Sequence, residues 1–275
     1  LWLYEGITEY FAYLIQVQSG LITPLDFFAE QMGGKIRGAS RYPEKKIPFT
    51  EMSERVFEKK YGRHYYQVYQ RGALMGLLLD IEIIRLTNGK KTLKDIVLEL
   101  ASKYGPSQSF DEETFFDEFT SLVHPELRQW FADYVEGTIP LDIEGGLSQI
   151  GVEYSKKGKH QVPKRILKDY GSKEHRLSFG KYKKVKKVGK KDPIGFKVGD
   201  KIDTDKLREE FYDDNGSPVA EGTEVVIFVK RDDAMIELPY SMELKERKYS
   251  HRLRILKDLT DSQQNYYSVW IGNKK

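Results

Sequence analysis

Residues 1–11, with the sequence LWLYEGITEYF, constrain the fold most strongly, because they place an acidic residue at the start of a strongly apolar helix. The helix is predicted from apolar residues that recur at the spacing of one helical face, namely Ile7, Tyr10, Phe11, Leu14 and Ile15. Glu5 stands at its beginning, and Glu9 follows one turn later on the same side. We therefore expect a helix over residues 5–19 that buries one face and carries two acids.

Glu5 has two interpretations on the residues alone. An acid in the first turn of a helix is favoured by the helix dipole, which is an ordinary structural role. A carboxylate in so apolar a setting also needs a partner, since an unpaired buried charge is costly. A metal ion could be that partner, so the residues leave both a structural acid and a metal ligand open.

The first half of the chain has helical patterns throughout. Thr23 and Pro24 predict the cap and first residue of a helix that runs to about residue 32, and the glycine-rich segment 33–39 is expected to break it. Further helices are expected at 70–87, from Thr92 onward, at 111–123 behind a capping box at 109–113, and at 126–135. The helix at 70–87 is the most apolar of these.

From residue 178 onward the pattern changes to β structure. Strands are predicted at 182–188, 225–230 and 235–238, with a hairpin turn at 231–233 and a helix at 207–212. The chain of 275 residues is long enough for two domains with separate cores. We therefore predict a multidomain α + β fold.

The boundary between the halves is strongly basic. Residues 156–191 hold fifteen Lys or Arg against two acids, although the net charge of the whole chain is only +3. This stretch is either an exposed face with a loop or a binding surface for an anionic membrane or nucleic acid. It contains no recognised nucleic-acid motif, so we predict no nucleic-acid partner.

Composition excludes several other classes. No stretch approaches the roughly 18 to 20 apolar residues that cross a bilayer, so no membrane span is predicted. There is no Cys, which excludes disulfides and a thiolate zinc site. The five His do not form an H-E-x-x-H motif, which places two imidazoles and a general-base Glu on one helix face.

Three segments resemble one family of metallopeptidases. WLYEGITEY resembles the helix that carries the third zinc ligand of the gluzincins. YQRGALMGLLLD at 69–80 and FADYVEGTIPL at 131–141 resemble segments of the glycyl aminopeptidase branch, whose thermolysin-like catalytic domain carries a C-terminal PDZ domain. The resemblance covers residues 1 to about 150 well and is loose beyond them.

The resemblance implies a domain plan. Residues 1–147 would be the helical C-terminal subdomain of the thermolysin-like catalytic domain, 148–250 a small divergent PDZ-like β domain with the basic insertion, and 251–275 a tail that packs back on the helices. GFKVGDKI at 195–202 and NGSPV at 215–219 resemble PDZ signatures. The segment 177–180 is a poor version of the carboxylate-binding loop, so binding of peptide termini is not expected.

The resemblance also implies a site. Glu5 would be a ligand of a catalytic zinc ion, and Glu9 would orient a ligating imidazole from the second shell, unless it is a plain surface acid. Tyr69 would donate to the oxyanion of the tetrahedral intermediate, unless it is a core aromatic like Tyr65 and Tyr66. Arg71 replaces the family's Lys. The H-E-x-x-H residues are expected to precede Leu1, so the chain alone should bind zinc weakly and be inactive.

We accordingly expect a zinc aminopeptidase that acts on peptides or proteins, exported or periplasmic as family members often are. A pseudo-peptidase that serves as a protein-interaction scaffold is the alternative, and a binder of anionic surfaces is a third interpretation. An encoded His-Glu pair upstream would separate the first two. The sequence does not indicate the oligomeric state.

Overall fold

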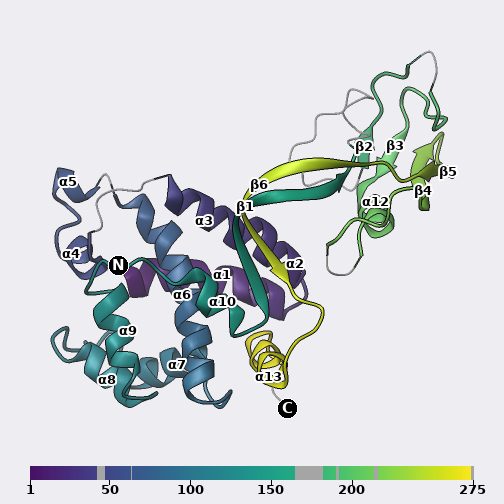
Figure 1. Cartoon of the computed structure of the whole chain (residues 1–275). Helices are drawn as coiled ribbons and strands as arrows, with labels where there is room; N and C mark the ends of the chain where they lie inside the picture. Colours follow the sequence, from purple (N-terminus) through teal and green to yellow (C-terminus); the bar gives the residue numbers. More distant parts are fainter. Residues whose placement is uncertain (42–46, 63, 165–181, 190–191, 214–215, 274–275) are drawn as a thin grey trace. The chain divides into compact units, whose positions relative to one another are not determined.

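A computed structural model describes residues 1–41, 47–62, 64–164, 182–189, 192–213 and 216–273 (Figure 1). The chain divides into two compact units. Unit 1 comprises Leu1–Lys157 and Ser250–Lys275, and unit 2 comprises Gly158–Tyr249. Unit 1 is helical apart from strand segments, and unit 2 is built on a β-sheet, so the predicted α + β class is confirmed.

Unit 1 contains the helices of the first half and the C-terminal helix. They are η1 Trp2–Gly6, α1 Ile7–Gln18, α2 Pro24–Asp26, η2 Phe27–Met32, α3 Gly33–Ser40, α4 Phe49–Glu54, α5 Lys59–Gly62, α6 Tyr66–Leu86, α7 Leu93–Lys103, α8 Phe115–Ser121, α9 Leu127–Tyr134, α10 Ile143–Ser148 and α13 Asp261–Trp270. Within the described residues, every helix is too short or too polar to traverse a lipid bilayer.

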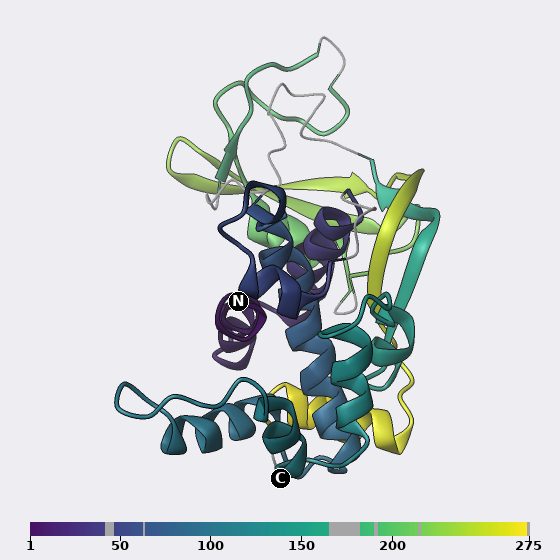
Figure 2. The same ribbon diagram turned by 90° about the vertical axis from the view of Figure 1, so that its left-hand side faces the viewer.

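Helix α6 is the centre of unit 1. It is apolar on almost every side, as a helix surrounded by other helices must be, and most of its residues are buried. It packs against η1, α1, α3, α7, α9, α10 and α13. Figure 2 shows α6 running lengthwise between its neighbours. The predicted apolar helix at 70–87 is therefore confirmed, and it begins earlier than expected.

A buried hydrogen-bond network ties the ends of unit 1 together. Tyr10 of α1 donates its hydroxyl to Oδ2 of Asp80 at 2.6 Å, and Trp270 of α13 donates Nε1–H to the Tyr10 oxygen at 3.0 Å. The other oxygen of Asp80 accepts the backbone N–H of Leu93 at 2.7 Å. Burial and the nearby Asp80 carboxylate raise the pKa of Tyr10 well above its usual value. Helices α1, α6, α7 and α13 are thus joined through one carboxylate.

Two long strands connect the units. They are β1 Val152–Pro163 and β6 Leu244–Ile255, which form a two-stranded sheet. Unit 2 has a four-stranded sheet in the order β2 Tyr182–Lys184, β3 Lys201–Asp203, β4 Glu224–Arg231 and β5 Ala234–Ser241, and helix α12 Thr204–Phe211 lies between β3 and β4 in sequence. Neighbouring strands in this sheet are antiparallel.

The turn between β4 and β5 confirms the predicted hairpin. Asp232 and Asp233 both have positive φ, of 48° and 67°, which two-residue hairpin turns require. One face of the sheet buries Ile202, Ile227 and Val229 in a core that is separate from the core of unit 1.

Three local predictions were wrong. The glycines at 33–39 do not end the helix, since η2 continues directly into α3. Gly38 allows α3 to pack closely on α6, because a Cβ at this position would lie 2.3 Å from Oε1 of Gln70. Helix α8 begins at Phe115 without a side-chain cap, so the capping box at 109–113 does not form. Strand β2 ends at Lys184 instead of 188. The predicted carboxylate-binding loop at 177–180 lies outside the described residues.

Candidate active site

The side chain of Glu5 is held by two phenols. Tyr65 donates its hydroxyl to Oε1 of Glu5 at 2.8 Å, and Tyr69 donates to Oε2 at 2.6 Å. The two phenol oxygens are 3.4 Å apart, and their rings meet edge to face with centroids 5.7 Å apart. We call Glu5, Tyr65 and Tyr69 the carboxylate clamp. Each carboxylate oxygen therefore has its own donor and a fixed direction.

Backbone contact between two glycines brings the clamp together. Glu5 belongs to the π-helix η1, a helix type that is common at functional sites, and Tyr65 directly precedes α6. A Cβ on Gly72 would lie 2.7 Å from the Cα of Gly6, so the two helices touch at their backbones. Because residues four apart share a helix face, Tyr65 and Tyr69 both point to the side where η1 approaches.

The clamp keeps Glu5 in its charged form. Hydrogen bonds from Tyr69 and then Tyr65 lower the pKa of the Glu5 carboxyl, and burial acts in the opposite direction. The same contact with Glu5 raises the pKa of Tyr69, which therefore remains a protonated donor. A half-buried, oriented carboxylate beside a neutral phenol is the result.

Glu9 lies one turn further along and has different partners. Its Oε1 is bound by the ammonium group of Lys35, from α3, and accepts a hydrogen bond of 3.4 Å from Tyr13. Lys35 is only 8% exposed, which is rare for a lysine, and its charge lies 5.4 Å from the Tyr13 ring centroid. Within the described part of the chain, no hydrogen bond reaches Oε2 of Glu9.

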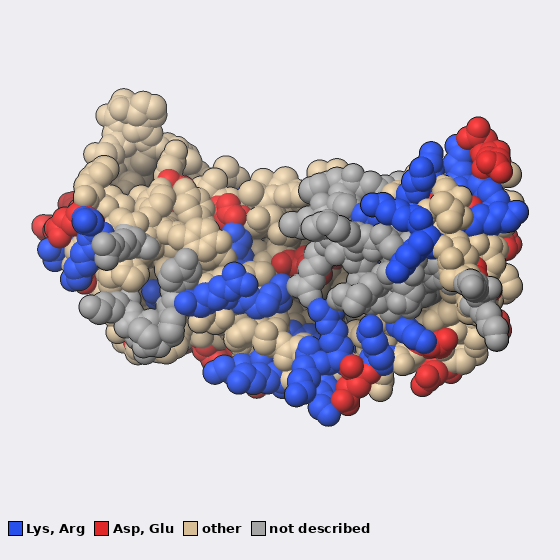
Figure 3. All heavy atoms as spheres, turned by 90° about the horizontal axis from the view of Figure 1, so that it is seen from above, with Lys and Arg blue, Asp and Glu red and all other residues tan. Residues whose placement is uncertain are grey.

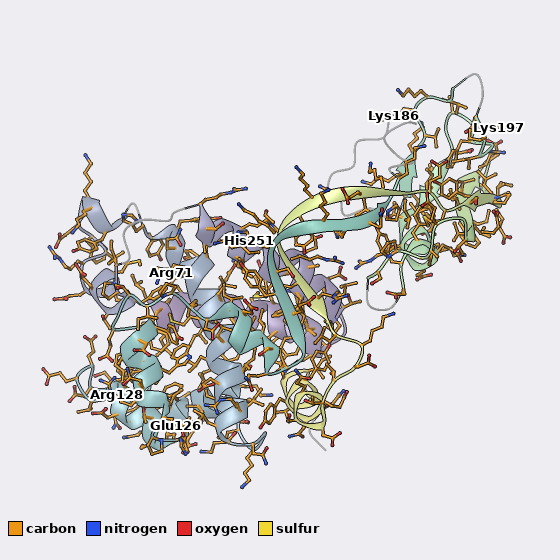
Figure 4. The ribbon with its side chains drawn as sticks, viewed as in Figure 1. Arg71, Glu126, Arg128, Lys186, Lys197 and His251 are labelled. Atoms are coloured by element: carbon orange, nitrogen blue, oxygen red, sulfur yellow. The ribbon has the colours of Figure 1, made fainter. Side chains whose placement is uncertain are left out.

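Arg71 lies on another face of α6 from the clamp. Its guanidinium stacks over the ring of Phe49, with Cζ 4.9 Å from the centroid, and burial lowers its pKa. It forms no ion pair with any residue that the structure describes. Figure 4 shows Arg71 near the α4 end of α6. Arg71 is therefore not part of the carboxylate clamp.

The structure brings together Glu5 and Tyr69, which the sequence singled out, and adds Tyr65 and Lys35. The sequence pattern favours Tyr65 as a core aromatic, although its spacing of four from Tyr69 places both phenols on one side of the helix. Nothing in the sequence marked Lys35, because its partner Glu9 is 26 positions away. In the described ranges, no three His, Cys, Asp or Glu side chains are placed to hold a metal ion.

Comparisons with known proteins give one family match and a similar solved structure. The family model described as M61 glycyl aminopeptidase matches residues 1–75, which include the whole clamp. The crystal structure of an aminopeptidase N family protein from Idiomarina loihiensis has a similar fold, with a TM-score of 0.54 and 21% identity. The match covers 98% of this chain and 48% of that one, so the chain spans about half the length of that structure. No curated protein matches the chain. The family match is confined to residues 1–75, and the solved structure shows a similar fold.

Proposed function

We propose that the intact protein is a zinc-dependent aminopeptidase and that Glu5 is one of its zinc ligands. The observation that carries this proposal is the carboxylate clamp, in which both oxygens of Glu5 are oriented by phenols. The family match over residues 1–75 supports the peptidase class. The intact protein would release residues from the N-terminus of peptides.

The donor chemistry of the clamp fits a zinc ligand. Zinc accepts carboxylate oxygens, and partners that hydrogen-bond a ligand fix its orientation. One carboxylate is not a complete site, so the proposal requires two imidazoles and a general-base Glu from outside residues 1–275. The chain by itself should then bind zinc weakly and hydrolyse nothing.

The residues of the clamp have separate roles in this proposal. Zinc, when bound, would polarise the scissile carbonyl and acidify the attacking water. Tyr69 would donate its hydroxyl to the oxygen that becomes negatively charged, where a preorganised donor stabilises the transition state more than the ground state. Tyr65 would keep its hydrogen bond to Glu5 while Tyr69 turns to the substrate.

Glu9 would act on a neighbouring ligand. Lys35 and Tyr13 both bind its Oε1, which leaves Oε2 for the second N–H of a ligating imidazole. Lys35 would compensate the second negative charge near Glu5. Metal ligands are commonly oriented by carboxylates in this way.

We further propose that unit 2 is a divergent PDZ-like domain and that the protein is exported or periplasmic. The antiparallel sheet with α12 between β3 and β4, and the GFKVGDKI segment at its entry, support the first point. The second rests on the resemblance to the family. We do not assign peptide-terminus binding to this unit.

A substrate with a free amino terminus tests the activity. The intact protein, loaded with zinc, should release the first residue of a peptide but leave the N-acetylated form of the same peptide intact. A chelator should abolish the release, and added zinc should restore it. If the intact protein holds no zinc and releases nothing, the aminopeptidase proposal fails and a scaffold role replaces it.

A further inference from the structure

The solvent face of the unit 2 sheet carries a row of lysines across three strands. Lys184 of β2 lies directly opposite Lys201 of β3, which lies directly opposite Lys230 of β4. Directly paired residues share a face, and the opposite face buries Ile202 and Val229 in the core. Like charges placed directly opposite each other destabilise a sheet.

Lysines in the adjoining loop extend the row. Lys186, Lys187 and Lys197 are exposed and form no ion pair with any described residue. Backbone hydrogen bonds between Val185 and Asp200 (2.8 Å), and between Gly199 and Val185 (2.9 Å), hold this loop against the start of β3. Figure 4 shows Lys186 and Lys197 at the same end of unit 2, and Figure 3 shows basic side chains gathered on this unit.

We call these lysines the basic face: Lys184, Lys186, Lys187, Lys197, Lys201 and Lys230. Asp233 reduces its charge, because it pairs with Lys230 at 2.8 Å and also lies near Lys201. Glu237 lies on the same side of β5. Asp200, a further acid near this face, is buried and accepts hydrogen bonds from Nε and Nη2 of Arg231 at 2.8 and 2.7 Å. Lys186, Lys187 and Lys197, which form no ion pair with any described residue, therefore keep this part of the basic face positively charged.

Exposed apolar side chains surround the basic face. Tyr182 is 39% exposed and shares the face of Lys184, Met235 is 46% exposed and lies directly opposite Lys230, and Val198 is 64% exposed beside Lys197. Among the described residues of unit 2, no other large apolar side chain is so exposed. Positive charge and exposed apolar groups therefore occur together on this unit.

We propose that the basic face docks unit 2 on the surface of an anionic lipid bilayer. Lysines near such a surface are attracted to its headgroups, and apolar side chains between them enter the boundary with the acyl chains. Nucleic acid fits less well, because its recognition favours Arg and aromatic stacking, whereas the cations here are all Lys and two of the three apolar groups are aliphatic.

Sedimentation of the full chain with vesicles tests this proposal. We expect binding to phosphatidylcholine vesicles that contain about one third phosphatidylserine, and none to phosphatidylcholine alone. Binding should weaken steeply as salt rises, because the attraction is screened. The measurement needs no peptidase activity, so it can fail or succeed independently of the proposed function.

Charge variants with a matched control make the test specific. The triple variant Lys186→Gln, Lys197→Gln, Lys201→Gln should lower the partition coefficient on the order of 100-fold, since each lysine near a membrane contributes about fivefold. The control Lys59→Gln, Lys90→Gln, Lys94→Gln removes the same charge from exposed positions of unit 1 and should change binding little. Equal losses in both variants would overturn the assignment to the basic face.

The apolar contribution has its own control. The pair Val198→Ser and Met235→Ser should weaken vesicle binding about tenfold without changing its dependence on salt, because apolar burial is not screened. Leu98→Ser, at an apolar position in unit 1 with 61% exposure, should have no effect. Absence of binding to anionic vesicles, or tight binding to single-stranded RNA without vesicle binding, would refute the proposal.

Discussion

At the scale of single residues, the two phenols of the clamp are not equivalent. Tyr69 makes the shorter hydrogen bond to Glu5, and Tyr65 approaches the other oxygen from one helical turn earlier. If Tyr69 leaves to serve a substrate, Tyr65 alone orients the carboxylate. The two tyrosines should therefore be separable by mutation.

Tyr65→Phe should lower the zinc affinity of the intact protein about 10-fold to 100-fold, because the ligand loses the partner that orients it. The loss would be measured by competition with a chelating dye. Tyr4→Phe removes an exposed phenol next to Glu5 in sequence and should leave the affinity unchanged. Equal zinc affinity in wild type and Tyr65→Phe would show that Tyr65 does not position Glu5.

Sequence reasoning reached part of this site. Glu5 and Tyr69 were found through motifs that resemble a family, and Glu5 also through its apolar setting. Tyr65 was missed because an aromatic cluster near an apolar helix is usually core. Lys35 could not be found, because its pairing with Glu9 depends on how α3 packs against α1.

At the scale of elements, close helix contacts depend on glycines in α6. Gly72 meets the backbone of Gly6, and Gly76 lies against Tyr10, where a Cβ would be 2.9 Å from the Tyr10 Cβ. Backbone cannot move aside as a side-chain end can. The position of η1, and with it Glu5, therefore depends on the absence of a side chain at Gly72.

Gly72→Ala should destabilise unit 1 by about 1–3 kcal/mol through overpacking against Gly6, which exceeds the helix-propensity gain. Urea unfolding followed by circular dichroism measures the change. Gly34→Ala is the control, because only the flexible end of Arg37 lies near its Cβ position. That substitution should be neutral or stabilising by up to about 1 kcal/mol. Similar stabilisation by Gly72→Ala and Gly34→Ala would contradict the close contact between Gly72 and Gly6.

The buried network of Tyr10 predicts a second stability effect. Tyr10→Phe removes the hydroxyl that donates to Oδ2 of Asp80 and accepts from Nε1–H of Trp270. This loss should lower the free energy of unfolding by about 3 kcal/mol. Tyr13→Phe removes only a long hydrogen bond to Glu9 and should cost less than about 1 kcal/mol. Equal decreases in the free energy of unfolding for Tyr10→Phe and Tyr13→Phe, measured with urea, would argue against the buried network of Tyr10.

Element types were predictable where periodicity was strong, as in α6, and where turn chemistry was specific, as at Asp232 and Asp233. The glycines at 33–39 misled the prediction, because low helix propensity was overridden by packing of α3 against α6. Propensity describes an isolated helix, whereas these glycines permit close approach between helices.

At the scale of the whole molecule, the two units have independent cores. The core of unit 1 contains residues from both ends of the chain, including Leu253 and Trp270, and none from unit 2. The chain passes from one unit to the other within β1 and again at β6, whose mostly polar pattern gave no strand signal in the sequence. The predicted boundary at 148 falls just before β1, whereas the units part within that strand.

Removal of unit 2 should therefore leave unit 1 folded. Replacing Gly158–Tyr249 with an Asn-Gly turn should retain the cooperative unfolding of unit 1, with a free energy within about 1 kcal/mol of the parent, because no core residue is lost. Calorimetry and circular dichroism would detect the transition. Loss of cooperative unfolding would show that unit 1 depends on unit 2.

The central claim is that Glu5 is a zinc ligand. Comparing the zinc content of the intact wild-type protein with that of its Glu5→Gln variant tests this claim most directly. An amide keeps the shape of the side chain but removes the negative charge, so the metal loses an anionic ligand. We predict about one zinc per chain in the wild type and in the control Glu54→Gln, and loss of both zinc and aminopeptidase activity in Glu5→Gln. Full zinc occupancy with unchanged affinity in Glu5→Gln would contradict the account.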